Sequence, residues 1–135
     1  MVSSVAAAFV QISLLGASPL SYEQAYKENE QSGKPLVVLI GAEWCPACKV
    51  MKNATMPQVA KDGVFHDVAF TVVDADKQPQ VAKEMLSSGG IPQLVMFHRT
   101  ADGWRHERLI GAQSPSAVVN FLRRGIRNAA DRLTK

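Results

Sequence analysis

The chain has 135 residues, of which 47% are hydrophobic and 20% are charged, and its formal net charge is +3. These values are typical of one globular domain that is long enough to bury a hydrophobic core without disulfide staples. The basic residues gather late, in FLRRGIRNAADRLTK, without the dense basic patch and interleaved aromatics of a nucleic-acid-binding surface. We therefore expect a solvated basic helix face and no nucleic-acid partner.

The first twenty residues carry no charged side chain. Their apolar stretch from Val5 to Leu15 is shorter than the roughly 20 residues of a transmembrane helix and resembles the apolar part of a signal peptide. We interpret residues 1–20 as an N-terminal extension, with a strand in FVQISLL, ahead of a domain at 21–135. The missing charges favour an extracytoplasmic location, periplasmic or membrane-proximal, and leave open a membrane tether in the parent chain. A cytoplasmic location is the alternative.

Beyond residue 20 the sequence alternates between helical and strand patterns. A helix is predicted from the cap Ser21 to Gly33, followed by a buried strand in PLVVLIGA. The next helix starts at Pro46, and we expect Pro57 to interrupt it, because a proline there removes a helical hydrogen bond.

The second half of the chain predicts a strand, a helix, two hairpin strands and a closing helix. These lie in VAFTVVDAD, QPQVAKEMLSS, QLVMFH, ERLIGA and SPSAVVNFLRRGIRN. The hairpin turn is expected in RTADGW at Asp102-Gly103, and Ser114 is expected to cap the last helix. This order predicts an α/β fold with one central mixed sheet and helices on both faces.

The only two cysteines, Cys45 and Cys48, enclose the start of the helix that begins at Pro46. If Cys45 is the N-cap, the free amides of Ala47 and Cys48 face its sulfur, and the helix dipole favours negative charge there. Both effects favour thiolate over thiol, so Cys45 is a candidate nucleophile. Cys48, one turn on, is close enough to form a disulfide with it and to resolve a mixed disulfide.

A CxxC pair also occurs in metal sites, so a redox-inert or metal-binding interaction module is the alternative interpretation. A structural zinc ion needs four ligands, and the three histidines are scattered singly, at His66, His98 and His106. We expect each histidine to have an ordinary surface or loop role, and we expect no metal and no organic cofactor.

Two separated motifs carry a family resemblance. WCPACK after an apolar strand resembles the WCxxCK active site of thioredoxin-like proteins, and GGIPQLVMF resembles their cis-proline segment. VVDAD is similar to the family's central strand, and ERLIGAQSPSAVVNFL to its last strand and closing helix. From about Tyr22 to Arg127 the chain is identified as a member of the thioredoxin-like superfamily. The resemblance implies a thioredoxin fold and a thiol–disulfide oxidoreductase in which Cys45 attacks and Cys48 resolves.

The resemblance also implies a substrate surface and partners. Substrate contacts fall on Trp44, Pro46, Ala47, Ile91 and Pro92, with a cis peptide bond before Pro92. In the family, the backbone of the residue before the cis-proline pairs with the substrate chain, as one strand pairs with a sheet edge. The implied partners are protein or peptide thiols and disulfides and an upstream redox donor, and we expect a monomer.

Three positions depart from the family pattern. Thioredoxins carry a buried aspartate where this chain has Leu39, and a partner lysine where it has Val72. Losing both together avoids an unpaired buried charge. Gly41 replaces a residue that is usually aromatic. We expect a drier core beneath Cys48, so that its proton must move through water or another group, with Glu43 a poorly placed candidate.

The Pro-Ala pair also differs from the Gly-Pro pair of thioredoxin. A proline at the second helical position removes one amide that faces the thiolate, whereas Pro46 at the first position removes none. One added charge-assisted hydrogen bond is worth roughly 1.5–3 kcal/mol, and about 1.4 kcal/mol corresponds to about 30 mV for a two-electron couple. We therefore expect a reductase or interchange protein that is less reducing than thioredoxin, and no strong oxidant.

Overall fold

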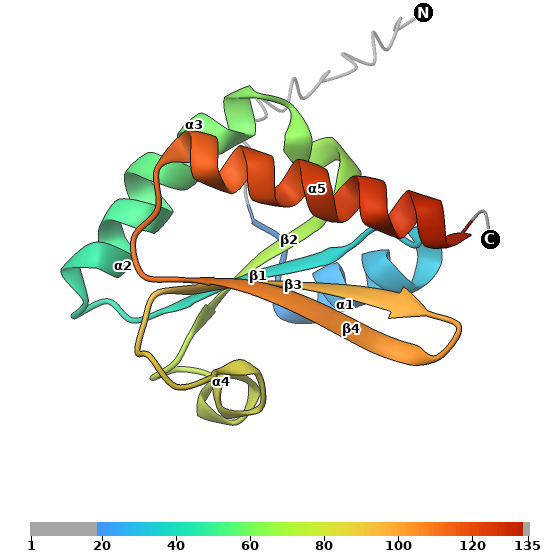
Figure 1. The fold of residues 1–135 in the computed structure, drawn as a ribbon. Coiled ribbons are helices and arrows are strands. Elements are labelled where there is room, and N and C mark those ends of the chain that lie inside the picture. Colours follow the sequence, from blue (N-terminus) through green and yellow to red (C-terminus); the bar gives the residue numbers. More distant parts are fainter. Residues whose placement is uncertain (1–18, 134–135) are drawn as a thin grey trace, which may run out of the picture.

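A four-stranded mixed sheet forms the centre of the computed structural model, which describes residues 19–133 (Figure 1). The strands lie in the order β2–β1–β3–β4, with β2 parallel to β1 and β3 antiparallel to both of its neighbours. Their bounds are β1 Leu36–Gly41, β2 Ala69–Asp74, β3 Gln93–Thr100 and β4 Gly103–Ile110. The predicted mixed sheet is confirmed.

Helices cover both faces of this sheet (Figure 1). The helices are α1 Tyr22–Ser32, α2 Pro46–Val50, α3 Met56–Lys61, α4 Pro79–Met85 and α5 Pro115–Leu133, with a π-helical turn at Met51–Thr55 and a 3-10 turn at Val64–Asp67. α3 and α5 pack on one face, and α1 and α4 pack on the other. None of the described helices has the length and apolarity to cross a membrane.

Strand β1 is buried along its whole length because it has a helical layer on each side. Val37 and Leu39 belong to the core beneath α3 and α5, whereas Val38 and Ile40 belong to the core beneath α1 and α4. Side chains of a strand alternate between its faces, so a continuous apolar run is what a strand between two cores requires. β1 therefore fixes the place at which the chain enters α2.

The helix caps follow the predictions. The Ser21 hydroxyl accepts a hydrogen bond of 3.2 Å from the Gln24 amide, and the Gln24 side chain accepts one of 3.0 Å from the Ser21 amide. Gly33 ends α1 in the left-handed region at φ 75°. The Ser114 hydroxyl accepts from the Ala117 amide at 3.2 Å and so caps α5.

The interruption predicted at Pro57 takes a different form. The helix that starts at Pro46 continues through the π-helical turn, in which the Met56 amide donates to the Met51 carbonyl, and then through α3. Pro57 follows this turn at the start of α3, and the widened turn accommodates the hydrogen bond that the proline cannot donate. The expected break is thus a local widening one turn before the proline.

The hairpin is tighter than predicted. Thr100 pairs with Gly103, so only Ala101 and Asp102 remain outside the strands, and most of the expected loop RTADGW is strand. Gly103 has φ 114°, a conformation that other residues rarely adopt, and this allows the short connection.

The N-terminal extension lies almost wholly outside the described residues, as does the strand expected in FVQISLL. Leu20, near the start of the described part, forms one parallel bridge with Thr71 at the outer side of β2.

Candidate functional site

Cys45 and Cys48 form a disulfide at the N-terminus of α2, with their Cα atoms 5.2 Å apart. Cys45 is the N-cap, as predicted, and its sulfur accepts from the Cys48 amide at 3.3 Å. The second expected donor, the Ala47 amide, makes no such bond in the described part of the chain. Both cysteines are buried, at 6% and 5% exposure, and they pack with Ala42, Ala47 and Ile91.

The segment around Pro92 lies beside this disulfide. The Ile91–Pro92 peptide bond is cis, as the family resemblance implied. The Ile91 carbonyl oxygen is 3.9 Å from the Cys45 sulfur, and Ile91 packs with Ala47 against the two cysteines. Pro92 is buried and Pro46 is exposed at the first position of α2. Two segments 46 residues apart thus meet at the sulfur.

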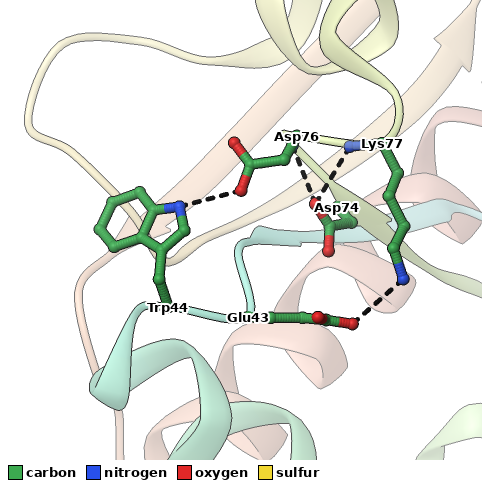
Figure 2. A network of polar contacts seen from close by, with 5 residues as sticks. All are labelled: Glu43, Trp44, Asp74, Asp76 and Lys77. Carbon is green, nitrogen blue, oxygen red and sulfur yellow. Dashed lines mark hydrogen bonds and ion pairs between the residues drawn. The ribbon is translucent and has the colours of Figure 1, made fainter.

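Trp44 stands in front of the disulfide with 69% of its surface exposed. Its indole N–H donates to the Asp76 carboxylate at 2.9 Å (Figure 2). Asp74 Oδ1 accepts from the amides of Asp76 and Lys77, which fixes the turn after β2. The hydrogen bond to Asp76, in the turn that follows β2, therefore orients Trp44.

An ion pair also joins the segment before α2 to the turn after β2. Lys77 Nζ lies 3.1 Å from Glu43 Oε1, and both side chains are largely exposed (Figure 2). The hydrogen bond that Lys77 donates to Glu43, and then the negative charges of Glu43 and Asp74, raise the pKa of Lys77. Because this pair is exposed, it contributes little to the stability of the fold.

Gln93 holds the loop that leads to Pro92, a role that the sequence analysis missed. Its fully buried amide nitrogen donates to the carbonyls of Ser87 and Gly90 at 2.8 and 2.9 Å. Its oxygen accepts from the Ser87 amide at 3.2 Å and from Arg108 Nη1 at 2.8 Å. Arg108 also donates to the Met85 carbonyl at 2.9 Å, so β4 and the end of α4 are joined through one side chain. A polar residue heading the apolar run QLVMF was the signal available in the sequence.

We predict that Gln93→Ala destabilises the protein by about 1–3 kcal/mol, because several buried or half-buried polar groups lose their partner. The loop before Pro92 should loosen. Because the family resemblance implies that this segment contacts a protein substrate, KM for a protein disulfide should rise while exchange with a small aromatic disulfide stays near wild type. Urea unfolding and steady-state kinetics measure the two effects. Gln113→Ala, which removes one exposed hydrogen bond to the Ile110 carbonyl, is the control and should change stability by less than about 0.5 kcal/mol. Equal stability of both variants would contradict the assignment.

Two apolar residues on the strands beneath Cys48 stand where the family has an aspartate and a lysine. Leu39 and Val72 are direct partners in the parallel ladder of β1 and β2, as their place in the family pattern implied. Apolar side chains therefore occupy both of these strand positions. A cavity of about 310 Å³ opens beside Cys48, and polar side chains join Leu39 and Val72 in lining it. The drier core beneath Cys48 stays a prediction.

The histidines do not join the site. His66 and His106 are exposed, whereas His98 is buried in β3, which corrects the expectation that all three lie at the surface or in loops. Among residues 19–133, no three His, Cys, Asp or Glu side chains are grouped in a way that would hold a metal ion.

The comparisons with known proteins agree with this arrangement. A family profile described as Thioredoxin matches residues 18–124. Thioredoxin H2 of Arabidopsis thaliana is 34% identical over 97 residues, which cover 72% of this chain and 68% of that protein. A solved thioredoxin structure from Thermus thermophilus has a TM-score of 0.67 at 21% identity, covering 81% of this chain and 86% of the other, and shows the fold.

A second kind of relative is much longer. The thiol:disulfide interchange protein DsbD of Pasteurella multocida is 28% identical over 108 residues. The match covers 77% of this chain and 19% of the DsbD protein. The chain thus corresponds to about a fifth of that relative's length.

Proposed function

We propose that this chain, which belongs to the thioredoxin family and is a thiol–disulfide oxidoreductase, acts as a protein disulfide reductase or interchange protein through Cys45 and Cys48. The observation that carries the proposal is the disulfide at the N-terminus of α2 beside the Ile91 carbonyl. Family members act on protein thiols and disulfides, so the substrate is a protein or peptide.

The proposed reaction has two exchanges. In the reduced protein the Cys45 thiolate, stabilised by the Cys48 amide and the helix dipole, attacks a substrate disulfide and releases the first substrate thiolate. Cys48 then attacks the Cys45 sulfur of the mixed disulfide, which releases the second substrate thiolate and forms the Cys45–Cys48 disulfide. Two electrons pass to the substrate. An upstream dithiol donor then supplies two more electrons, which reduce the Cys45–Cys48 disulfide again.

The substrate is proposed to bind across the segment before Pro92. Ile91 offers its backbone beside Cys45, where an extended peptide can pair as an added strand. Exposed Trp44 and Pro46 and the half-buried Ala47 supply the apolar surroundings. These four residues, with buried Pro92 behind them, form the proposed docking surface.

The proposed redox role rests on the place of Pro46 at the first position of α2. The Ala47 amide at the second position stays available as a second donor to the Cys45 sulfur once the disulfide opens. This favours the dithiol form relative to a protein with proline at the second position.

The proposed location rests on the N-terminal residues. The uncharged first twenty residues favour an extracytoplasmic protein, with a cytoplasmic one as the alternative. Fractionation of cells producing the full chain distinguishes the two locations.

Reduction of insulin by dithiothreitol tests the function. The wild-type protein should accelerate the precipitation of the reduced insulin chains, and the double variant Cys45→Ser/Cys48→Ser should match the uncatalysed rate. A folded wild-type protein that exchanges neither with insulin nor with a small aromatic disulfide would instead be a redox-inert module, the alternative for a CxxC pair.

A further inference from the structure

The second exchange requires Cys48 to lose a proton, although only 5% of its surface is exposed. The strand positions that hold an aspartate and a lysine in the family offer no acceptor here, because Leu39 and Val72 occupy them. The acceptor must therefore lie at another position around the sulfur.

Asp74 is the carboxylate that the strand register brings beside Cys48. Gly41 pairs with Asp74 across the parallel ladder. A Cβ atom built on Gly41 would lie 3.0 Å from the Cys48 sulfur, so that sulfur sits directly over Gly41. Asp74 follows Val72 by two residues and so points to the same face of the sheet. Side chains of neighbouring strands on one face start about 5 Å apart, which puts the Asp74 carboxylate within reach of one or two water molecules from the sulfur.

The cavity supplies the space for that water. Its volume is about 310 Å³, and Cys48, Gly41 and Asp74 all line it. A water molecule occupies about 30 Å³ in the liquid, so several fit, and the polar side chains around the cavity provide their partners. Gly41 has no side chain and so lets the Cys48 sulfur lie directly over it at the edge of the cavity, whereas an aromatic residue is usual at this position in the family.

We propose that Asp74 accepts the Cys48 proton through water in this cavity while Cys48 resolves the mixed disulfide. The inference rests on the proposed function and deepens it. The proton moves from the Cys48 thiol through water to the carboxylate, the new bond joins the two cysteine sulfurs, and the bond from Cys45 to the substrate breaks. The proton then passes from Asp74 through water to the departing substrate thiolate, so Asp74 is regenerated.

The other ionisable groups around the cavity are less suited to this role. Glu43 also lines it, but its carboxylate is 72% exposed and pairs with Lys77 at 3.1 Å. Asp76 is exposed and accepts from the Trp44 indole. Asp74 is half-buried, and its described hydrogen bonds engage Oδ1.

Lysines face the cavity from the helical side. Lys49 and Lys52 line it from α2 and the π-helical turn. An ammonium group has no lone pair, so neither lysine can accept the Cys48 proton. Asp74 is therefore the half-buried carboxylate that lines the cavity.

The test separates the two exchanges with 5,5′-dithiobis(2-nitrobenzoate). Attack by Cys45 releases one coloured thiolate, and resolution by Cys48 releases a second, so stopped-flow absorbance reports both steps in one trace. Asp74→Asn keeps Oδ1 as the acceptor for the two amides and removes only the charge. The variant should leave the first phase unchanged. It should slow the second phase at pH 7 by about 100-fold, the low end of the effect that a positioned general base has on a rate.

Glu43→Gln is the matched control on the same cavity rim and should leave both phases unchanged. Asp74→Glu, which retains a carboxylate, should recover at least part of the second-phase rate. Equal slowing by Asp74→Asn and Asp74→Glu would overturn the proposal, since it would indicate a disturbed turn. An unchanged second phase in Asp74→Asn would overturn it as well, while leaving the redox function intact. Absence of the first phase in wild type would instead refute the proposed function.

Discussion

Cys45→Ser is expected to reduce disulfide exchange to the uncatalysed background, a loss on the order of 10³-fold or more. The reason is that the protein loses the thiolate that attacks the substrate disulfide. Cys48→Ser should behave differently. Its Cys45 can still attack, but no second thiol resolves the product, so mixed disulfides at Cys45 should accumulate. Mass spectrometry after incubation with a disulfide-containing protein measures the trapped fraction.

The two serine variants are matched controls for each other, because both remove one sulfur from the same helical turn. The difference between them rests on Cys45 being the N-cap and on the amide bond to its sulfur. Trapping through Cys48 in Cys45→Ser, at a yield comparable with that of Cys48→Ser, would reverse the assignment of attacking and resolving residues.

Leu39→Asp should lower the free energy of unfolding by about 3 kcal/mol at pH 7, because it places an unpaired carboxyl group in a site with 2% exposure. Burial raises the pKa of the introduced carboxyl above its unfolded value. The part of the penalty that comes from the buried charge should therefore vanish below about pH 4 and grow as pH rises, whereas the loss of the leucine's apolar contacts costs stability at every pH. Urea unfolding at several pH values measures the cost.

The double variant Leu39→Asp/Val72→Lys should recover part of this loss. Leu39 and Val72 face each other in the β1–β2 ladder, so the introduced charges would be partners. Val72→Lys alone is the second control, because Val72 is half-buried and a lysine there can extend toward the cavity. A Leu39→Asp variant as stable as the parent at pH 7, or a double variant less stable than Leu39→Asp, would contradict the described core.

Local features of this fold were predictable from the sequence because their causes are local. The caps at Ser21 and Ser114 and the stop at Gly33 each depend on one side chain and its own helix end. The same holds for the place of Cys45 after a buried strand. Pro57 was harder to interpret, because a proline predicts a missing hydrogen bond but not whether the helix breaks or widens around it.

Features that depend on register and packing were not predictable in this way. The link of Gln93 to Ser87 and Arg108 joins three segments whose proximity only the folded sheet creates. That Asp74 and Cys48 line one cavity likewise depends on the strand register, which pairs Asp74 with Gly41 beneath the Cys48 sulfur. The meeting of Ile91 with Cys45 was predicted, but through the family resemblance, since nothing local to either segment indicates the other.

The reduction potential of the Cys45–Cys48 pair tests the central claim most directly. The full chain is equilibrated with glutathione buffers of known ratio, quenched with an alkylating agent and analysed by mass to count free thiols. The account predicts one reversible two-electron transition between about −270 and −180 mV, the range from thioredoxin to interchange proteins. A potential near −120 mV, as in a strong oxidant, or a pair whose thiol count does not change across the buffers, would contradict it.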